Sequence, residues 1–384
     1  MVNSVQATCP SRAVPRASGF GIDCCKLALM AGITAFFYAS PLLAQPRAGD
    51  TAVEYARLDN PGATTVIRSM NSANEVAGGF QRDRRKASSA LIFFANNGVE
   101  DVVGEQGAGN SVLYGINDQN EVAGAYNTPV AMRPFRAVRR AGVQELALPP
   151  GGTGGVAYAI NEVGEAAGYA SGTAGVQPVW WTRRGEVRLL QSVGTDTARA
   201  LDLNDRGDVV GVSGDAVRTA VVWPQKGGIV SLGTLAGFTH SEAVSISENG
   251  TVAGVAIGAG EFVNRSRGVL WPSGGGAPQD LGALSGGVDT RARDVNNRGE
   301  VVGTSSSANG DRAFVWTAST GMQDLNTLVT IPGLVMTDAL SINRKGDIVV
   351  MGYDGEVSAH AHGGSDEHVD HHAARRIFVL RVLQ

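Results

Sequence analysis

The stretch Leu201-Asp202-Leu203-Asn204-Asp205-Arg206-Gly207-Asp208-Val209-Val210-Gly211 consists of two short apolar runs separated by a polar turn. Leu201 and Leu203 are expected to share one face of a strand, because successive side chains in a strand point to opposite faces. Asn and Asp side chains bond nearby backbone in turns, and glycine adopts a positive φ without a steric penalty. The β-branched Val209 and Val210 suit the returning strand. The stretch therefore predicts a β-hairpin.

The same hairpin pattern occurs seven times at a nearly constant spacing. The first turn residues are Asn71, Asn117, Asn161, Asn204, Ser247, Asn296 and Asn343, so consecutive copies are 43 to 49 residues apart. The fourth turn position holds glycine in five copies, and Asn74 and Asn120 replace it in the first two. Asparagine is the next best residue at positive φ. A repeat of this period indicates one supersecondary unit per copy.

Each copy contains two further strand patterns after the hairpin. The third strand often ends in tryptophan, as in Thr219–Trp223, Gly268–Trp271 and Ala313–Trp316, and a short fourth strand follows a glycine-containing turn. Four strands at this period are typical of a β-propeller blade. One blade cannot bury both of its faces, so neighbouring blades must stack. We expect the tryptophans in register to be buried between blades, whereas Trp180, which is out of register, should face the other way and be exposed.

The two ends of the repeat region complement each other. The seventh copy lacks a fourth strand after Arg376–Leu380, and Val53–Leu58 precedes the first copy without a partner of its own. We expect these strands to pair and close a ring, which removes two open sheet edges. The predicted fold class is all-β: a seven-bladed β-propeller of four-stranded antiparallel blades, with the N-terminal strand completing the C-terminal blade.

The N-terminal residues are interpreted as a targeting segment. Arg12, Arg16 and Lys26 precede an apolar run at 27–39, and the sequence around Ala44 suits signal cleavage. The run is short for a transmembrane span. The expected organisation is a secretory signal at 1–44, a linker at 45–52 and a single propeller at 53–384, in a protein that is extracellular or periplasmic and has no membrane span after signal removal.

Composition restricts the possible partners and bonds. The chain has 384 residues, of which 43% are hydrophobic and 18% charged, and its net charge is −4. This charge gives no electrostatic case for nucleic acid binding. The three cysteines, Cys9, Cys24 and Cys25, all precede the repeats, so the mature chain is expected to contain no disulfide. A monomer is expected.

A histidine-rich insertion at 354–375 lies between the last two strand patterns. Five of the six histidines lie there, with three carboxylates among them, and imidazole with carboxylate suits Zn²⁺, Ni²⁺ or Cu²⁺. The candidate metal ligands are His360, His362, His368, His371 and His372. The alternative is a polar insert that picks up a divalent transition metal weakly if at all, and this is favoured because a Gly-Gly-bearing loop offers no rigid support. No other cofactor is expected.

The loops between second and third strands vary most among the copies. In a propeller these loops share one face with the connections between blades, and such a face is the usual binding surface. The first copy has a basic run there, and its residues are candidate partner-binding residues together with Trp180: Arg82, Arg84, Arg85 and Lys86. An anionic glycan or phosphate could dock on this run. A solvated charge run is the more ordinary explanation.

The recurring Ile-Asn…Gly-x-Val-Val-Gly, Ala-Phe-x-Trp and Asp-Leu-Gly motifs resemble those of the extracellular HAF-repeat family. Arg312-Ala313-Phe314 matches two residues of the His-Ala-Phe triplet that names the family, and no copy keeps the histidine. The resemblance covers nearly everything from Tyr55 to Leu383. It implies a secreted bacterial protein and transfers no active site.

Two functions of different classes follow from this organisation. The first is a secreted non-enzymatic scaffold that binds a protein or glycan partner through its variable-loop face. The second is a carbohydrate-active or other hydrolytic enzyme, with carboxylates from different blades meeting in the central funnel. Two funnel carboxylates roughly 5–9.5 Å apart would favour the glycosidase. A funnel lined only by small and apolar groups would favour binding.

Overall fold

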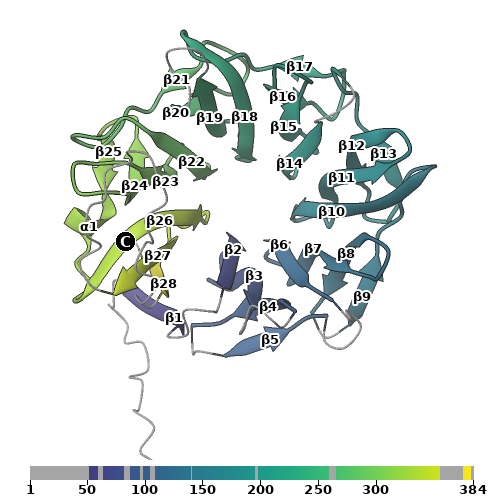
Figure 1. Cartoon of the computed structure of the whole chain (residues 1–384), viewed down its shortest axis with the longest axis horizontal. Coiled ribbons are helices and arrows are strands. Elements are labelled where there is room, and N and C mark those ends of the chain that lie inside the picture. Colours follow the sequence, from purple (N-terminus) through teal and green to yellow (C-terminus); the bar gives the residue numbers. More distant parts are fainter. Residues whose placement is uncertain are drawn as a thin grey trace, which may run out of the picture. The chain divides into compact units, whose positions relative to one another are not determined.

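The computed structural model of the chain describes residues 52–58, 64–81, 87–95, 98–103, 109–139, 141–194, 198–258, 265–354 and 375–381. Their strands form seven four-stranded antiparallel sheets around a central axis (Figure 1). The predicted seven-bladed, all-β propeller is confirmed. The helix α1 (Leu325–Leu328) has only four residues, and no helix in the described part of the chain is long and apolar enough to cross a bilayer.

Each blade takes four strands in chain order from the axis outward. Blades 1 to 3 are β2 (Thr64–Met70), β3 (Val76–Gln81), β4 (Ser89–Phe93) and β5 (Val99–Asp101); β6 (Ser111–Ile116), β7 (Glu121–Asn127), β8 (Met132–Val138) and β9 (Gly142–Glu145); β10 (Gly152–Ile160), β11 (Ala166–Gly172), β12 (Gly175–Trp181) and β13 (Val187–Leu189). Blades 4 to 6 are β14 (Arg199–Leu203), β15 (Val209–Ser213), β16 (Thr219–Trp223) and β17 (Val230–Ser231); β18 (Phe238–Ile246), β19 (Val252–Gly258), β20 (Ser266–Trp271) and β21 (Gln279–Asp280); β22 (Thr290–Val295), β23 (Val301–Ser305), β24 (Arg312–Thr317) and β25 (Gly321–Asp324).

Blade 7 is assembled from both ends of the described chain. It contains β26 (Leu334–Ile342), β27 (Ile348–Asp354) and β28 (Arg375–Leu380), and its fourth strand is β1 (Ala52–Leu58). β1 pairs antiparallel with β28, from Ala52 opposite Leu380 to Leu58 opposite Arg375, with one irregularity between Glu54 and Ala56. The predicted ring closure by the N-terminal strand is therefore confirmed, and β28 has no open edge.

The hydrophobic core is divided among the interfaces between blades. Within the described residues, each of the seven interfaces has its own buried cluster, including one between blades 7 and 1 that contains Met70 and Val379. Trp181, Trp223, Trp271 and Trp316 are all buried, as predicted. Each tryptophan pairs with a residue of the second strand of its blade. In all four blades this partner lies five positions after the first turn residue. The repeat sequence thus sets the contact between neighbouring blades.

A β-bulge in the first strand explains the glycine that ends the hairpin motif. In β14, Ala200 pairs with Gly211 and Asp202 pairs with Val210, so Leu201 is the extra residue. A Cβ at Gly211 would overlap the carbonyl oxygen of Arg199. The sequence prediction that Leu201 and Leu203 share one strand face missed this bulge, because a bulge breaks the two-residue alternation.

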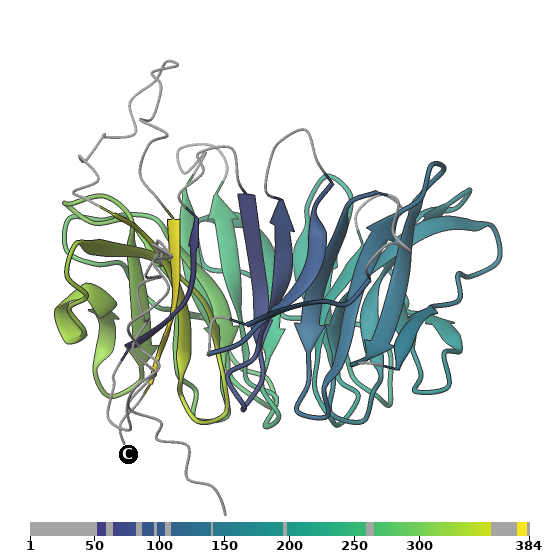
Figure 2. The same ribbon diagram turned by 90° about the horizontal axis from the view of Figure 1, so that it is seen from below.

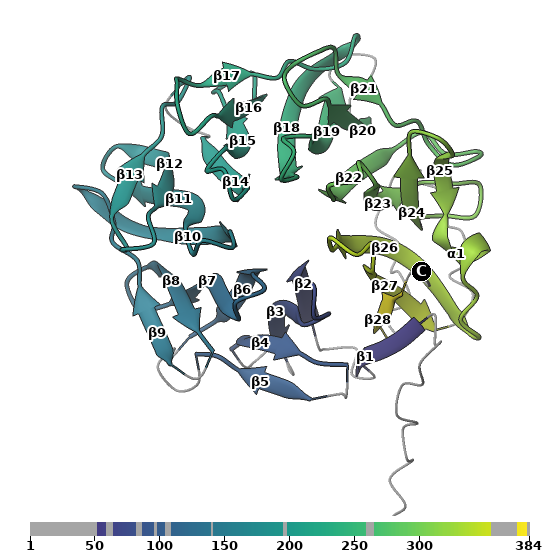
Figure 3. The ribbon, with the colours of Figure 1, turned by 180° about the vertical axis from the view of Figure 1, so that it is seen from behind.

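The ring has two faces with different connections. The turns between first and second strands lie on one face, here called the turn face, and appear at the lower edge in Figure 2. The opposite face, here called the loop face, carries the second-to-third-strand loops and the connections from each blade to the next. Figure 3 views the ring from behind, with the first strands of all blades nearest the axis.

Candidate functional site

Asparagine side chains join the blades in a circle on the turn face. Six of the seven first turn residues are buried asparagines: Asn71, Asn117, Asn161, Asn204, Asn296 and Asn343. Each Nδ2 donates to the carbonyl oxygen of the first turn residue in the next blade, at 2.9 to 3.4 Å, and the last bond runs from Asn343 to Asn71. In blade 5, where Ser247 takes this position, Asn249 Nδ2 donates to Asn297 O at 3.0 Å.

The second turn residues form another circle closer to the axis. The side-chain oxygens of Asp118, Glu162, Asp205, Glu248 and Asn297 each accept a hydrogen bond from the backbone N–H of the second turn residue in the preceding blade, at 2.6 to 3.0 Å. Four of these five side chains are acidic. The turn face therefore gathers carboxylates around its central opening.

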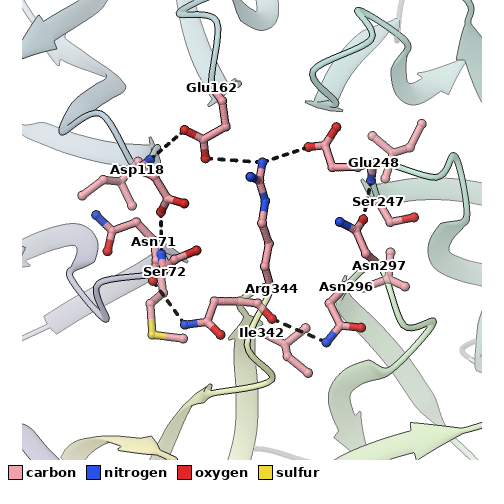
Figure 4. A pocket seen from close by; sticks show the side chains of 15 residues that line it. Asn71, Ser72, Asp118, Glu162, Ser247, Glu248, Asn296, Asn297, Ile342 and Arg344 are labelled. Atoms are coloured by element: carbon pink, nitrogen blue, oxygen red, sulfur yellow. Dashed lines mark hydrogen bonds and ion pairs between the residues drawn. The ribbon is translucent and has the colours of Figure 1, made fainter.

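Arg344 of blade 7 reaches across this opening toward the carboxylates (Figure 4). Its Nη2 lies 3.5 Å from Glu162 Oε1, 3.0 Å from Asp205 Oδ2 and 3.3 Å from Glu248 Oε1. Burial would lower the pKa of Arg344, but the surrounding carboxylates raise it overall. Burial also raises the pKa values of Glu162 and Glu248. The cavity at this opening is about 120 Å³ and is lined by groups that already bond one another.

Two further carboxyl groups lie deeper, on the first strands of blades 4 and 6. Asp202 accepts hydrogen bonds from the backbone N–H groups of Leu203 and Ile246, both at 2.8 Å. Ser245 Oγ donates to Asp294 Oδ1 at 2.7 Å, and its interaction with Asp202 partly offsets the rise of the Asp202 pKa. Burial raises the pKa of Asp202 to about 7, and the Asp294 charge adds to the rise.

Asp294 is bonded just as fully. It accepts hydrogen bonds from the backbone N–H groups of Val295 and Ile342 and from the Ser341 hydroxyl, at 2.8 to 2.9 Å, besides the bond from Ser245. Burial raises its pKa as well. These bonds connect blade 6 to blades 5 and 7. Both carboxyl groups thus act as links between blades, and all four of their oxygens already accept hydrogen bonds.

Apolar side chains are exposed on both faces: Val163 lies in a turn of the turn face, and four valines lie on the loop face. Val130, Val193, Val217 and Val288 have relative exposures of 85, 61, 50 and 46%. All four lie in second-to-third-strand loops or in connections between blades. Val193 and Val217 belong to adjoining segments, because Gly194 approaches Asp215 and Gly214 approaches Val217. Contiguous exposed apolar groups mark surfaces that another molecule covers, and of these four valines Val193 and Val217 lie in adjoining segments.

Most of the predicted site residues fall outside the described part of the chain. These are the candidate metal ligands His360, His362, His368, His371 and His372, and the basic residues Arg82, Arg84, Arg85 and Lys86. The predicted signal segment 1–44 also lies outside it. Among the described residues, no group of three or more His, Cys, Asp or Glu side chains is arranged to hold a metal ion.

Trp180 is only partly as predicted. It does face away from its neighbour Trp181, since Trp181 packs between blades 2 and 3 and Trp180 between blades 3 and 4. However, Trp180 is half-buried rather than exposed, and the Arg188 guanidinium lies 5.1 Å from its ring centroid. Trp180 packs against blade 4, because the second face of blade 3 also has to be covered by apolar side chains.

Sequence reasoning did not single out Asp202, Asp294 or Arg344. An alignment of the seven repeats shows that these three residues are unusual at their positions. The position two residues before the first turn residue is otherwise small, as in Gly115, Ala159 and Ser245, so an aspartate there is anomalous. Arg344 is likewise the one cation at a turn position that otherwise holds acidic or neutral side chains.

No protein-family model matches the chain, and no curated protein sequence matches it. Solved structures do resemble it. Virginiamycin B lyase from Staphylococcus aureus is 9% identical with a TM-score of 0.52, and the comparison covers 86% of this chain and 98% of that one. A streptogramin B lyase is 10% identical with a TM-score of 0.50, covering 85% and 96%.

A third similar structure is that of YCF48 bound to D1 peptide. It is 12% identical, has a TM-score of 0.51, and the match covers 89% of this chain and 98% of that one. Similarities at this level of identity show the fold alone. The class of protein is therefore a seven-bladed β-propeller of the repeat type, a fold that includes both binding scaffolds and enzymes.

Proposed function

We propose that this chain is a secreted, non-enzymatic propeller that binds a protein or glycan partner through its loop face. The observation that carries the proposal is the contrast between the two faces. The turn face is polar, and its groups are bonded to one another, with Arg344 held by three carboxylates. The loop face exposes Val130, Val193, Val217 and Val288, whereas the first-to-second-strand turns expose one large apolar side chain among the described residues, Val163.

Other features agree with this proposal. The loops on this face vary most in length and sequence among the repeats, whereas the turns are uniform. Among the similar structures, YCF48 holds a bound peptide. Membership of the HAF-repeat family, secretion through the segment 1–44 and a partner-binding role for the Arg82–Lys86 run belong to the proposal. The predicted partner-binding role of Trp180 does not fit the loop face, because Trp180 lies one residue before the turn-face end of β12. Sequencing of the mature N-terminus tests secretion, with Gln45 as the expected first residue.

The experiment compares equivalent substitutions on the two faces. The purified protein is screened against an array of defined neutral and acidic glycans and against a displayed random-peptide library. Each ligand found is then titrated against Val217→Asp and Val130→Asp on the loop face and against Val163→Asp on the turn face. Val163 is a matched control because it is also an exposed valine, at 45%.

The proposal expects the two loop-face variants to weaken binding at least tenfold, because a carboxylate cannot be buried unpaired in an apolar contact without cost. The Val163→Asp variant should bind normally. Ligands that are lost on Val163→Asp and retained on the loop-face variants would place the binding surface on the turn face and refute the proposal.

A hydrolytic enzyme is the second candidate, and one observation favours it. The Asp202 carboxyl has a pKa of about 7 and interacts with Ser245, as Asp294 does, and titratable groups with raised pKa values often mark catalytic sites. Against this, the oxygens of both groups are already bonded between blades. Hydrolysis of 4-nitrophenyl glycosides that disappears in both Asp202→Asn and Asp294→Asn, with folding intact, would establish the enzyme.

A further inference from the structure

Five side chains from blades 1 to 4 form a continuous row, here called the aromatic row: Arg68, Tyr114, Tyr158, Tyr169 and Arg199. The Arg68 Cζ atom lies 5.5 Å from the Tyr114 ring centroid. The ring centroids of Tyr114 and Tyr158 are 5.1 Å apart in an edge-on arrangement, and those of Tyr158 and Tyr169 are 5.7 Å apart. The Arg199 Cζ atom lies 5.3 Å from the Tyr169 centroid. The row therefore has a cation at each end and three phenols between them.

The repeat geometry brings these residues together. Arg68, Tyr114 and Tyr158 are the extra residues of the first-strand bulges in three consecutive blades. A bulged residue has no direct cross-strand partner, so its side chain is not committed to either face of the blade. These first strands lie nearest the axis (Figure 1). Arg68, Tyr114 and Tyr158 thus lie on one side of the inner wall of the ring, and Tyr169 joins them from the second strand of blade 3.

Arg68, Tyr114 and Tyr158 each lie two residues before the turn-face end of their strand, whereas Tyr169 and Arg199 lie near the loop face. Arg199 is the first residue of β14, which begins on that face, and Tyr169 lies three residues before the loop-face end of β11. On the turn face, Arg344 and its carboxylates occupy the central opening. A ligand that reached the row would therefore enter from the loop face, where the proposed function places binding.

The guanidinium groups of the row contact tyrosine rings, but its hydrogen-bonding groups have no polar partner within the described residues. Among the described residues, neither arginine of the row has an ion pair, and none of the three phenol hydroxyls has a hydrogen bond. Burial raises the pKa of Tyr114, and it raises the pKa of Tyr158 to about 12, so both remain phenols that can donate. Elsewhere in the ring, by contrast, Arg218 pairs with Glu242 and Arg293 with Asp338.

The geometry points to an acidic oligosaccharide as the ligand of the aromatic row. We propose that carboxylated sugar rings, such as those of uronic acids, stack on the tyrosines while Arg68 and Arg199 bind their carboxylates. Guanidinium binds carboxylate through paired, charge-assisted hydrogen bonds. The C–H surfaces of sugar rings pack on aromatic rings, and ring hydroxyls accept from the phenols. This proposal deepens the proposed function and depends on its loop-face access.

The first test is calorimetric titration of the mature protein with tetra-uronates derived from galacturonic, mannuronic and guluronic acid. Methyl-esterified tetragalacturonate is the matched probe, since it keeps the shape and loses the charge. At least one acid form should bind, at least tenfold more tightly than an uncharged counterpart, and its affinity should fall as salt rises. Absence of binding by every acid form at 1 mM would overturn the proposal.

The second test locates the site with variants. Arg68→Gln and Arg199→Gln should each weaken uronate binding at least tenfold, and Tyr158→Phe, which removes only a hydroxyl, should weaken it a few-fold. Arg291→Gln is the control, because Arg291 is an exposed arginine that holds in blade 6 the position of Arg199 in blade 4. Circular dichroism melting confirms that each variant is folded.

Three outcomes would refute the inference: equal binding by all variants, equal loss in Arg291→Gln, or tighter binding of hexaglutamate than of any uronate. The proposed function fails separately. If uronates do not bind but array ligands still depend on Val217 and Val130, loop-face binding stands and the acidic oligosaccharide is rejected.

Discussion

Asn117 offers the most direct perturbation of the asparagine circle. Its buried side chain makes four hydrogen bonds. Oδ1 accepts from the backbone N–H groups of Gln119 and Glu121, at 3.1 and 2.8 Å. Nδ2 donates to Glu121 Oε2 at 3.1 Å and to Asn161 O of the next blade at 2.9 Å. The first two bonds stabilise the turn, whereas the last one connects two blades.

Asn117→Ala leaves the backbone N–H groups of Gln119 and Glu121 without these acceptors, and Asn161 O keeps only the hydrogen bond from its own turn. Each buried unsatisfied group costs about 1–3 kcal/mol. Because water can enter from the cavity on the turn face, we expect the lower part of the range for these two groups, a loss of about 2 kcal/mol in the free energy of unfolding. Asn117→Asp separates the two contributions. It keeps the acceptor for the turn but removes the donor and places a carboxylate against Asn161 O and Glu121.

The assay is urea unfolding followed by tryptophan fluorescence at pH 7.5 and pH 4. If the bond between blades matters, Asn117→Asp is at least as destabilising as Asn117→Ala at pH 7.5. It should recover in part at pH 4, where a protonated carboxyl can donate again. An Asn117→Asp protein as stable as the wild type at pH 7.5 would show that only the turn bonds matter, and the circle would then have no role in holding blades together.

Three further predictions concern stability. The Asp202 pKa is about 7, against 3.8 for the free group, so the folded state keeps a proton that the unfolded state loses. The contribution of this proton to the free energy of unfolding is fully present below pH 3.8 and is lost as the pH rises through 7. Its upper bound is about 4 kcal/mol. The wild type should therefore lose more stability between pH 5 and pH 8 than Asp202→Asn, and parallel pH profiles in urea unfolding contradict this. Arg344→Met leaves the turn-face carboxylates without their cation and should cost about 1–2 kcal/mol, less at 1 M NaCl because salt screens the repulsion; an effect independent of salt argues against the ion-pair account. Deleting β1 opens the edge of β28 and should lower the melting temperature by about 10 °C and cause self-association in analytical ultracentrifugation; an unchanged monomer with wild-type melting counts against ring closure.

The repeat itself made the fold predictable from the sequence. Three features indicate the same four-stranded blade: the turn residues, the β-branched returning strands and the tryptophans in register. Because the pattern recurs in seven copies, the assignment does not depend on any one ambiguous segment. Positive φ at Asn74 and Asn120 confirms the reasoning about the fourth turn position. The closing strand was predictable because two incomplete units at the ends of the repeat region complement each other.

The candidate sites were less predictable because they depend on where the repeats differ. Tyr114 and Tyr158 look like ordinary strand residues until the bulge releases their side chains from the pleat. Contacts around the ring, such as that from Arg344 to Asp205, join residues that are far apart in the sequence and follow only from closure. The turn alone accounts for the asparagines in the sequence. Nothing in the pattern therefore indicated that their side chains also donate to the next blade.

We propose that ligands bind at the aromatic row, which they enter from the loop face, and not at the turn face. A solved structure of the protein with a bound tetra-uronate measures this most directly. The account predicts a carboxylate within hydrogen-bond distance of the Arg68 or Arg199 guanidinium and a sugar ring against Tyr158. Sugar density in the turn-face opening beside Arg344, with the aromatic row unoccupied, would contradict it.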